Sequence, residues 1–171
     1  MAHRIAVTTT KGGDARAESF LRSLKKVFPE SLLVKVVTVA TYVVDASLSE
    51  SELKIAAERL THPLIEEGST AVLAPAAYDY AIEIGYLPGV TDNVGKTARE
   101  TIEDALGRTF AEDQHVYSSL FIFLTGVGSR EEAEHMAREL HNPLIQRASV
   151  WGADTREFPI VVPRVELLEH L

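Results

Sequence analysis

The chain comes nearest to a catalytic motif at residues 89–97, which read GVTDNVGKT. A glycine-rich loop that follows a strand and ends in Gly-Lys-Thr at the start of a helix can wrap phosphate oxygens with its backbone N–H groups. That motif places four residues between its two glycines, whereas five residues separate Gly89 from Gly95. An enzyme that uses this loop on a nucleotide is therefore the weakest of the functions that the sequence suggests.

The same segment is better interpreted as a structured turn. Pro88 and Gly89 are adjacent, and this pair of residues favours a tight bend. Thr91 or Asp92 then offers the side-chain oxygen that caps the first turn of a helix.

The histidines and carboxylates form no catalytic or metal-binding pattern. None of the six histidines belongs to the His-Glu-x-x-His spacing of a zinc-binding helix. One predicted helix carries Glu131, Glu132, Glu134 and His135, and we interpret them as a solvated face. The chain has no cysteine, which excludes disulfides, thiolate metal sites and thiol nucleophiles. We therefore predict no catalytic residue, no metal site and no cofactor.

The composition suits a protein with a substantial core that binds neither nucleic acid nor membranes. The 171 residues are 46% hydrophobic, and the net charge is -8, most of it carried by residues 81–171. Nucleic acids and anionic membranes require a basic surface. The N-terminus lacks the apolar stretch of a signal peptide, and no apolar run reaches the length of a spanning helix. We expect a cytoplasmic protein.

An internal repeat organises the chain. Residues 62–65 (HPLI) recur 80 positions later as residues 142–145 (NPLI). At the same offset, Ser49 and Ser129 are each followed three residues later by Glu, the pattern of a capping box. The apolar positions of the two following helices also match (Leu53, Ala56, Ala57, Leu60; Ala133, Met136, Ala137, Leu140). These matches in register predict a duplicated unit.

Each unit is predicted to contain four strands and two helices. The first has a strand at 4–10, a helix at 14–28, two strands within 32–46 joined at Ala40-Thr41, a helix at 50–61 and a strand near 71–73. The second has a strand at 81–87, a helix at 93–107, strands near 115–119 and 120–125, a helix at 130–141 and a strand at 147–151. The predicted fold class is α+β, with two tandem ferredoxin-like β-α-β-β-α-β units.

The predicted units are residues 1–75 and 80–152, with a linker at 74–79. Their antiparallel sheets are expected to pack face to face as a pseudo-dimer, because each unit leaves one sheet face bare. Residues 153–171 form a C-terminal extension. Its apolar part, Phe158–Pro163, is expected to cover a sheet edge as a strand, to pack on the sheets in another way, or to lead into a larger partner domain.

The second unit resembles the PurS family. In that family a strand ends in a turn that reads Pro or Lys, then Gly-Val-x-Asp; a glycine follows three residues later, and then a helix. The matching residues are Pro88, Gly89, Asp92 and Gly95. The family's Asn-x-x-Ile segment before the last strand is matched at Asn142, Pro143 and Ile145. The first unit keeps the rear motif at residues 62–66 and has a degenerate front at residues 11–14.

The resemblance implies an assembly role. PurS is the small subunit of phosphoribosylformylglycinamidine synthase, which uses ATP and ammonia from glutamine to form an amidine. PurS-like units work in pairs and bridge the large ATP-binding synthetase subunit and the glutaminase subunit, so these two are the implied partners. Further self-association is left open, as is a fusion to the synthetase. The seven matching residues are then expected to shape turns or contact a partner.

A second hypothesis comes from the fold class rather than from the family. Paired ferredoxin-like units also form regulatory domains that bind a small molecule where the two units meet. The sequence therefore leaves two main functions open, an assembly subunit and a small-molecule sensor.

Overall fold

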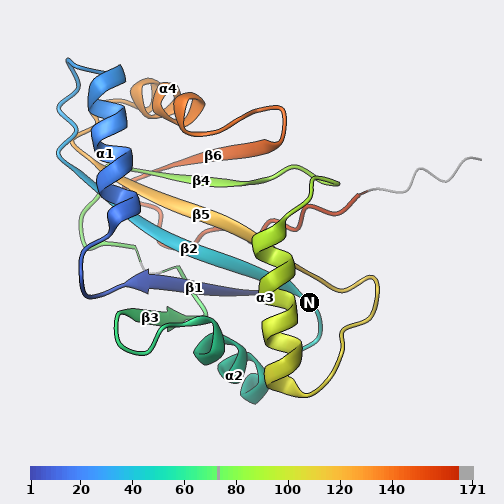
Figure 1. Ribbon diagram of the computed structural model, residues 1–171. Coiled ribbons are helices and arrows are strands. Elements are labelled where there is room, and N and C mark those ends of the chain that lie inside the picture. Colours follow the sequence, from blue (N-terminus) through green and yellow to red (C-terminus); the bar gives the residue numbers. More distant parts are fainter. Residues whose placement is uncertain (73, 166–171) are drawn as a thin grey trace, which may run out of the picture.

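The structure, a computed structural model, describes residues 1–72 and 74–165 (Figure 1). The order strand, helix, strand, helix, strand occurs twice. The first set is β1 (His3–Thr9), α1 (Ala15–Val27), β2 (Lys35–Asp45), α2 (Glu50–Leu60) and β3 (Glu66–Ser69). The second set is β4 (Tyr80–Tyr86), α3 (Asn93–Leu106), β5 (His115–Thr125), α4 (Arg130–Leu140) and β6 (Gln146–Gly152).

The six strands of the described residues belong to one antiparallel sheet in the order β3-β1-β2-β5-β4-β6. The expectation of two sheets packed face to face is therefore wrong. The two sets of elements meet edge to edge at β2 and β5, which pair over eleven residues with Ala40 opposite Leu120. Without this pairing β2 and β5 would each be an edge strand with unpaired backbone N–H and C=O groups. The β2–β5 pairing gives these groups hydrogen-bond partners.

The predicted break within residues 32–46 is also wrong, since β2 is one unbroken strand and β5 likewise. Ala40 and Thr41 are not turn residues, and the run around them is rich in β-branched side chains that favour an extended backbone. Each set is consequently β-α-β-α-β rather than β-α-β-β-α-β.

The last strand of the first set begins earlier than predicted. It is β3, at Glu66–Ser69, rather than a strand near residues 71–73. Val72 instead packs in an apolar cluster with side chains of the sheet, and Leu73 lies outside the described residues.

Local sequence signals fix where the helices begin. The capping box predicted at Ser49 is confirmed, with Ser49 Oγ accepting from Glu52 N–H and the Glu52 carboxylate accepting from Ser49 N–H. Ser129 Oγ likewise accepts from the N–H of Glu132. The Glu132 carboxylate, however, accepts from Gly128 N–H rather than from Ser129 N–H, so this capping box is not reciprocal. Each cap satisfies a backbone donor that has no partner within its helix.

The helices cover one face of the sheet in two pairs, and each pair takes one helix from each set of elements (Figure 1). Ala17 and Leu24 of α1 pack with Met136 of α4 over β4 and β5. Ala56 of α2 packs with Ile102 of α3 over β1. The helices of one set therefore complete the apolar packing of the other. The division of the chain into units at 1–75 and 80–152 and an extension at 153–171 stays a prediction.

The opposite sheet face is covered by irregular chain. Tyr78 from the linker and Phe158 from the C-terminal segment pack on Phe121 and Phe123 of β5. The C-terminal segment thus lies across the face of the sheet rather than along its edge. We call this face the back face.

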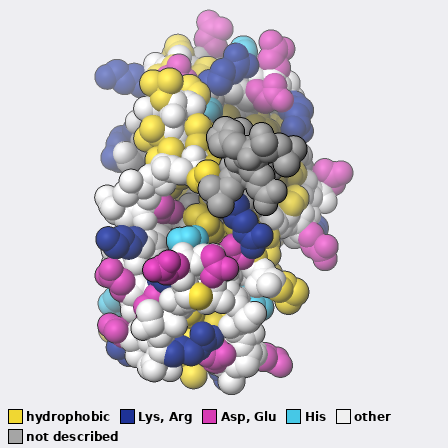
Figure 2. All heavy atoms as spheres, turned by 90° about the vertical axis from the view of Figure 1, so that its right-hand side faces the viewer, with side chains coloured by type: hydrophobic (Ala, Val, Ile, Leu, Met, Phe, Trp, Pro, Cys, Tyr) yellow, Lys and Arg dark blue, Asp and Glu magenta, His cyan; other side chains and the backbone are white. Residues whose placement is uncertain are grey.

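The outer surface carries mixed charge. Acidic and basic side chains are interspersed on the face seen in Figure 2, without a continuous basic stripe. In the part of the chain that the structure describes, no helix is both long enough and apolar enough to cross a membrane.

Candidate functional site

The turn between β4 and α3 has the geometry that its sequence predicts. Val90 N–H donates to Leu87 O at 3.2 Å, which closes a four-residue turn with Pro88 second and Gly89 third. Gly89 has φ +81°, and a positive φ at the third position defines a type II turn and favours glycine. Pro88 and Gly89 therefore set the direction in which the chain enters α3.

Asp92 joins this turn to the centre of the sheet. One carboxylate oxygen accepts from Gly95 N–H at 2.8 Å and from the Ser118 hydroxyl at 2.7 Å, and the other accepts from Ser118 N–H at 2.6 Å. Of the two predicted caps, Asp92 rather than Thr91 is the one observed. The Gly95 N–H that a phosphate loop would offer to a ligand is already bonded to this carboxylate.

Gly95 has a steric role in the same turn. A Cβ atom at Gly95 would lie 2.4 Å from Val116 O, well inside van der Waals contact. The absence of a side chain therefore lets the first turn of α3 approach β5 closely.

The first set of elements repeats this arrangement. Asp14 accepts from Ala17 N–H at 3.0 Å, and its second oxygen accepts from the N–H and the hydroxyl of Thr38. Asp14 and Asp92 thus cap a helix and bind a central strand in the same way, with Ala17 at the position of Gly95.

The rear motifs form a second matched pair of turns. Ile145 N–H and Gln146 N–H both donate to Asn142 O, and Leu144 N–H donates to Asn142 Oδ1. Pro143 occupies the second position of this turn, where its fixed φ is favourable. The same bonds occur around His62, to which Leu64, Ile65 and Glu66 donate.

Each rear turn also presents apolar side chains to solvent. Leu64 is 73% exposed and Leu144 is 84% exposed, and Ile65 and Ile145 are exposed beside them. Ile65 O accepts from Thr10 N–H beyond β1, and Ile145 O accepts from Leu87 N–H beyond β4. Since β1 and β4 run in opposite directions, the two turns lie at opposite ends of the sheet.

The back face holds a buried group of charges that the sequence analysis missed. Glu83 is 0% exposed, and its carboxylate accepts from Arg147 Nη2 at 3.1 Å. Arg4 is 5% exposed and donates to the carbonyls of Phe158 and Pro159 at 2.8 and 2.7 Å. Burial lowers the pKa of the Arg4 guanidinium, Glu83 opposes this shift and Arg147 adds to it. We call Arg4, Glu83 and Arg147 the back-face cluster.

The back-face cluster is not fully hydrogen-bonded. Among the described residues, the buried side-chain polar atoms without a partner are Arg4 Nε, Thr8 Oγ1, Glu83 Oε2 and Arg147 Nε and Nη1. The available signal in the sequence was a single charged residue inside each of two apolar strands, at Arg4 and Glu83. No local pattern indicated that the two would share one face.

A groove lies on the helical face where the two sets of elements meet. It has a volume of about 290 Å³ and lies above Ala40 and Leu120, between Arg16 and Phe20 of α1 and Val94 of α3, with Tyr42 and Tyr86 also lining it. Burial raises the pKa of the Tyr42 phenol, Glu66 adds to this shift, and Arg16 opposes it. The sensor hypothesis places its ligand in this groove, between the two sets of elements.

No cluster of three or more histidine, aspartate or glutamate side chains that could hold a metal ion occurs within residues 1–72 and 74–165.

No protein-family model matches the chain, and no curated protein matches it. The resemblance to PurS therefore depends on the residues of the chain itself.

Proposed function

We propose that the chain is a non-catalytic assembly subunit or domain of phosphoribosylformylglycinamidine synthase in the cytoplasm. In this role it joins the ATP-binding synthetase to the glutaminase that releases ammonia. The PurS-like residues Pro88, Gly89, Asp92 and Gly95 shape one turn, and Asn142, Pro143 and Ile145 shape another. The observation that carries the proposal is the matched pair of exposed apolar turns at the two ends of the sheet.

Duplication of one ancestral unit is part of the proposal. It is supported by the hydrogen bonds that recur around Asp14 and Asp92 and around His62 and Asn142. A covalent pair keeps its halves at an effective concentration of about millimolar, so pairing no longer depends on the concentration of free subunits.

The two turns suit a bridging function because each presents a leucine that is largely exposed, with a partly exposed isoleucine beside it. Exposed apolar side chains that gather at one place commonly mark a protein interaction site. One turn at each end of the sheet would let the chain contact two partners at once.

A pull-down from extract of the source organism, with this chain as bait, tests the proposal. Recovery of a large ATP-binding synthetase together with a glutamine amidotransferase is the expected result. The variant Leu64→Ser with Leu144→Ser should recover less of both, whereas Ile55→Ser, at another exposed position on α2, should recover as much as the unmodified chain. A folded chain that recovers neither enzyme would refute the assembly role.

The groove above Ala40 and Leu120 favours the second function, a small-molecule sensor. A ligand that binds the folded chain raises its apparent stability by mass action. A thermal-shift screen of amino acids and nucleotides separates the two functions, because a sensor predicts a saturable increase in Tm that Tyr42→Ala removes. An unchanged Tm throughout the screen would count against the sensor.

A further inference from the structure

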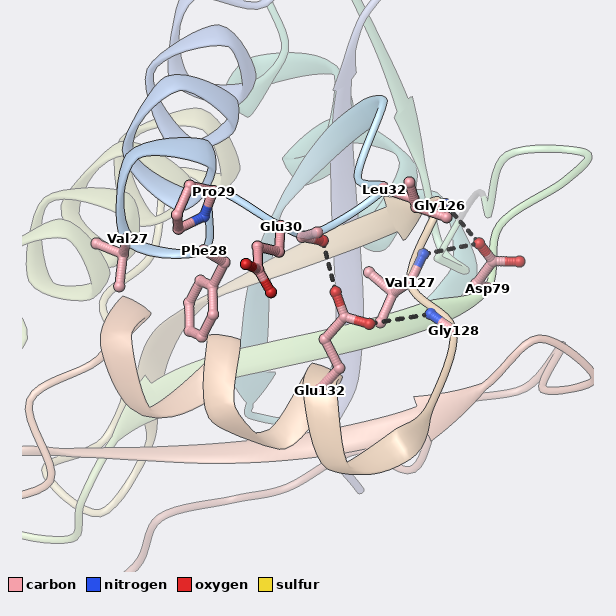
Figure 3. A pocket seen from close by; sticks show the side chains of 11 residues that line it. Val27, Phe28, Pro29, Glu30, Leu32, Asp79, Gly126, Val127, Gly128 and Glu132 are labelled. Atoms are coloured by element: carbon pink, nitrogen blue, oxygen red, sulfur yellow. Dashed lines mark hydrogen bonds between the residues drawn. The ribbon is translucent and has the colours of Figure 1, made fainter.

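A second apolar surface lies between the end of α1 and the start of α4 (Figure 3). It is a pocket of about 820 Å³, lined on its apolar side by Val27, Phe28, Pro29, Leu32 and Val127. Leu32 is 80% exposed. We call it the α1–α4 pocket.

The charged groups that line the α1–α4 pocket are all acidic. They are Glu30, Asp79 and Glu132, and Figure 3 shows the carboxylates of Glu30 and Glu132 turned towards the same gap. Asp79 accepts from the N–H groups of Gly126 and Val127, and Glu132 accepts from the Ser31 hydroxyl and Gly128 N–H. These donors are neutral, so the pocket keeps three negative charges and has no cation among its lining residues.

The corresponding place in the other half of the molecule is filled by the chain itself. Glu52, which matches Glu132 at the offset of 80, accepts from Arg108 Nε at 2.9 Å. Arg108 Nη2 also donates to Ser47 O at 3.0 Å, and its guanidinium lies 5.3 Å from the centre of the Phe110 ring. An arginine thus satisfies the carboxylate at the start of α2 and stacks on an aromatic ring.

The loop after α1 lacks this arginine. Its first residues are Phe28, Pro29 and Glu30, whereas the loop after α3 begins with Gly107 and Arg108. At the offset of 80, Phe28 stands where Arg108 does and Glu30 stands where Phe110 does, so this loop supplies a ring and a carboxylate to the pocket but no cation. The α1–α4 pocket therefore has the carboxylate and the ring without the guanidinium that lies between them in the other half.

We propose that the α1–α4 pocket docks a segment of a partner protein that presents an arginine beside an apolar side chain. The arginine lies between Glu30 and Glu132 and stacks on Phe28, and the apolar neighbour packs on Leu32. Arginine suits this place better than lysine because its planar guanidinium both binds carboxylates and stacks on rings. The inference is independent of the proposed synthase role, since it uses neither rear turn.

The test uses the tripeptide acetyl-Leu-Arg-Leu-amide and the ¹⁵N-labelled chain. Binding should shift the amide signals of Gly126 and Gly128 in a saturable way. The analogue with citrulline in place of arginine has nearly the same shape without the charge, and it should bind about five-fold more weakly, the upper range for a partly exposed ion pair. Equal binding of the two peptides, or saturable shifts only elsewhere, would overturn the proposal.

Variants separate docking from folding. Within the described residues no group hydrogen-bonds or ion-pairs with the Glu30 carboxylate. Glu30→Gln should therefore leave Tm unchanged and weaken the arginine peptide about three-fold, with no effect on the citrulline peptide. Leu32→Ser should weaken both peptides. Glu67→Gln on β3 removes the same charge far from the pocket and should change neither affinity. Unchanged affinity in Glu30→Gln would also overturn the proposal.

Discussion

Ala40 lies directly opposite Leu120 in the central strand pair, and the two residues are 80 positions apart. The same offset separates the Ser49 and Ser129 helix caps. Ala40 and Leu120 are therefore one pair of matched residues that meet at the centre of the sheet. From either edge inwards, the sheet has the third, the first and then the second strand of a set. This arrangement places equivalent turns at opposite ends of one sheet.

Replacing Asp92 should destabilise the protein more than an ordinary helix cap would. Asp92→Ala removes the cap on Gly95 N–H and both bonds to Ser118, and we expect a loss of about 2–3 kcal/mol in the free energy of unfolding. Urea denaturation measures this change. Asp104→Ala, on an exposed position of the same helix, should cost less than about 0.5 kcal/mol. Equal effects of the two substitutions would contradict the role assigned to Asp92.

Helix caps of this kind could be predicted because they depend on residues three positions apart. The matched rear turns were also predictable, since proline and a side-chain acceptor lie within the turn. The pairing of β2 with β5 could not be predicted in this way, because the two strands lie about 80 residues apart along the chain. No local sequence pattern indicates which strand edge pairs with which. The break predicted at Ala40-Thr41 is wrong for a related reason, since β2 pairs along its whole length with β5, which lies about 80 residues further along the chain.

The back-face cluster shows why part of the candidate site was missed. Arg4, Glu83 and Arg147 belong to three strands that are far apart along the chain. Their proximity follows from the strand order and from the C-terminal segment that covers them. Neither feature leaves a periodic signal in the sequence.

Removing the buried carboxylate should be costly. Glu83→Ala leaves Arg147 without its partner and places two like charges on a covered face, and we expect a loss of about 3 kcal/mol or more. Chemical denaturation gives the value, and Glu100→Ala on the outer side of α3 serves as the exposed control. A loss below about 1 kcal/mol for Glu83→Ala would mean that the cluster is not buried in solution.

Arg4 should hold the C-terminal segment against the sheet. Arg4→Met keeps the apolar stem but removes the bonds to the carbonyls of Phe158 and Pro159. Trypsin should then cleave after Arg156 faster than in the unmodified chain, because the segment opens more often. Arg22→Met, on an exposed position of α1, should not change the rate. The same cleavage rate in Arg4→Met would show that other contacts hold the segment.

Stability should depend on pH through Glu52. Its hydrogen bond with Arg108 and the bond from Ser49 N–H hold the pKa of the carboxyl below its ordinary value. A lowered folded-state pKa stabilises the fold above the unfolded-state pKa, about 4.3, and the gain is lost as the pH falls through the folded-state value. Glu52→Gln should therefore have a lower urea midpoint than the unmodified chain at pH 7. The difference between the two midpoints should disappear as the pH falls below about 4.

A matched substitution separates this effect from a general loss of negative charge. Glu58→Gln, which removes an exposed carboxylate of α2, should keep a nearly constant difference in urea midpoint from the unmodified chain across the same pH range. A gap that persists or widens in acid for Glu52→Gln would contradict the assigned ion pair.

The most direct test of the assembly role is reconstitution of the synthase reaction. Purified synthetase and glutaminase from the same source are assayed for amidine formation with glutamine or with free ammonia, with and without this chain. We predict that glutamine supports the reaction only when the chain is present, that ammonia supports it in both cases, and that Leu64→Ser with Leu144→Ser reduces the glutamine-dependent rate. The same glutamine-dependent rate without the chain would contradict the account.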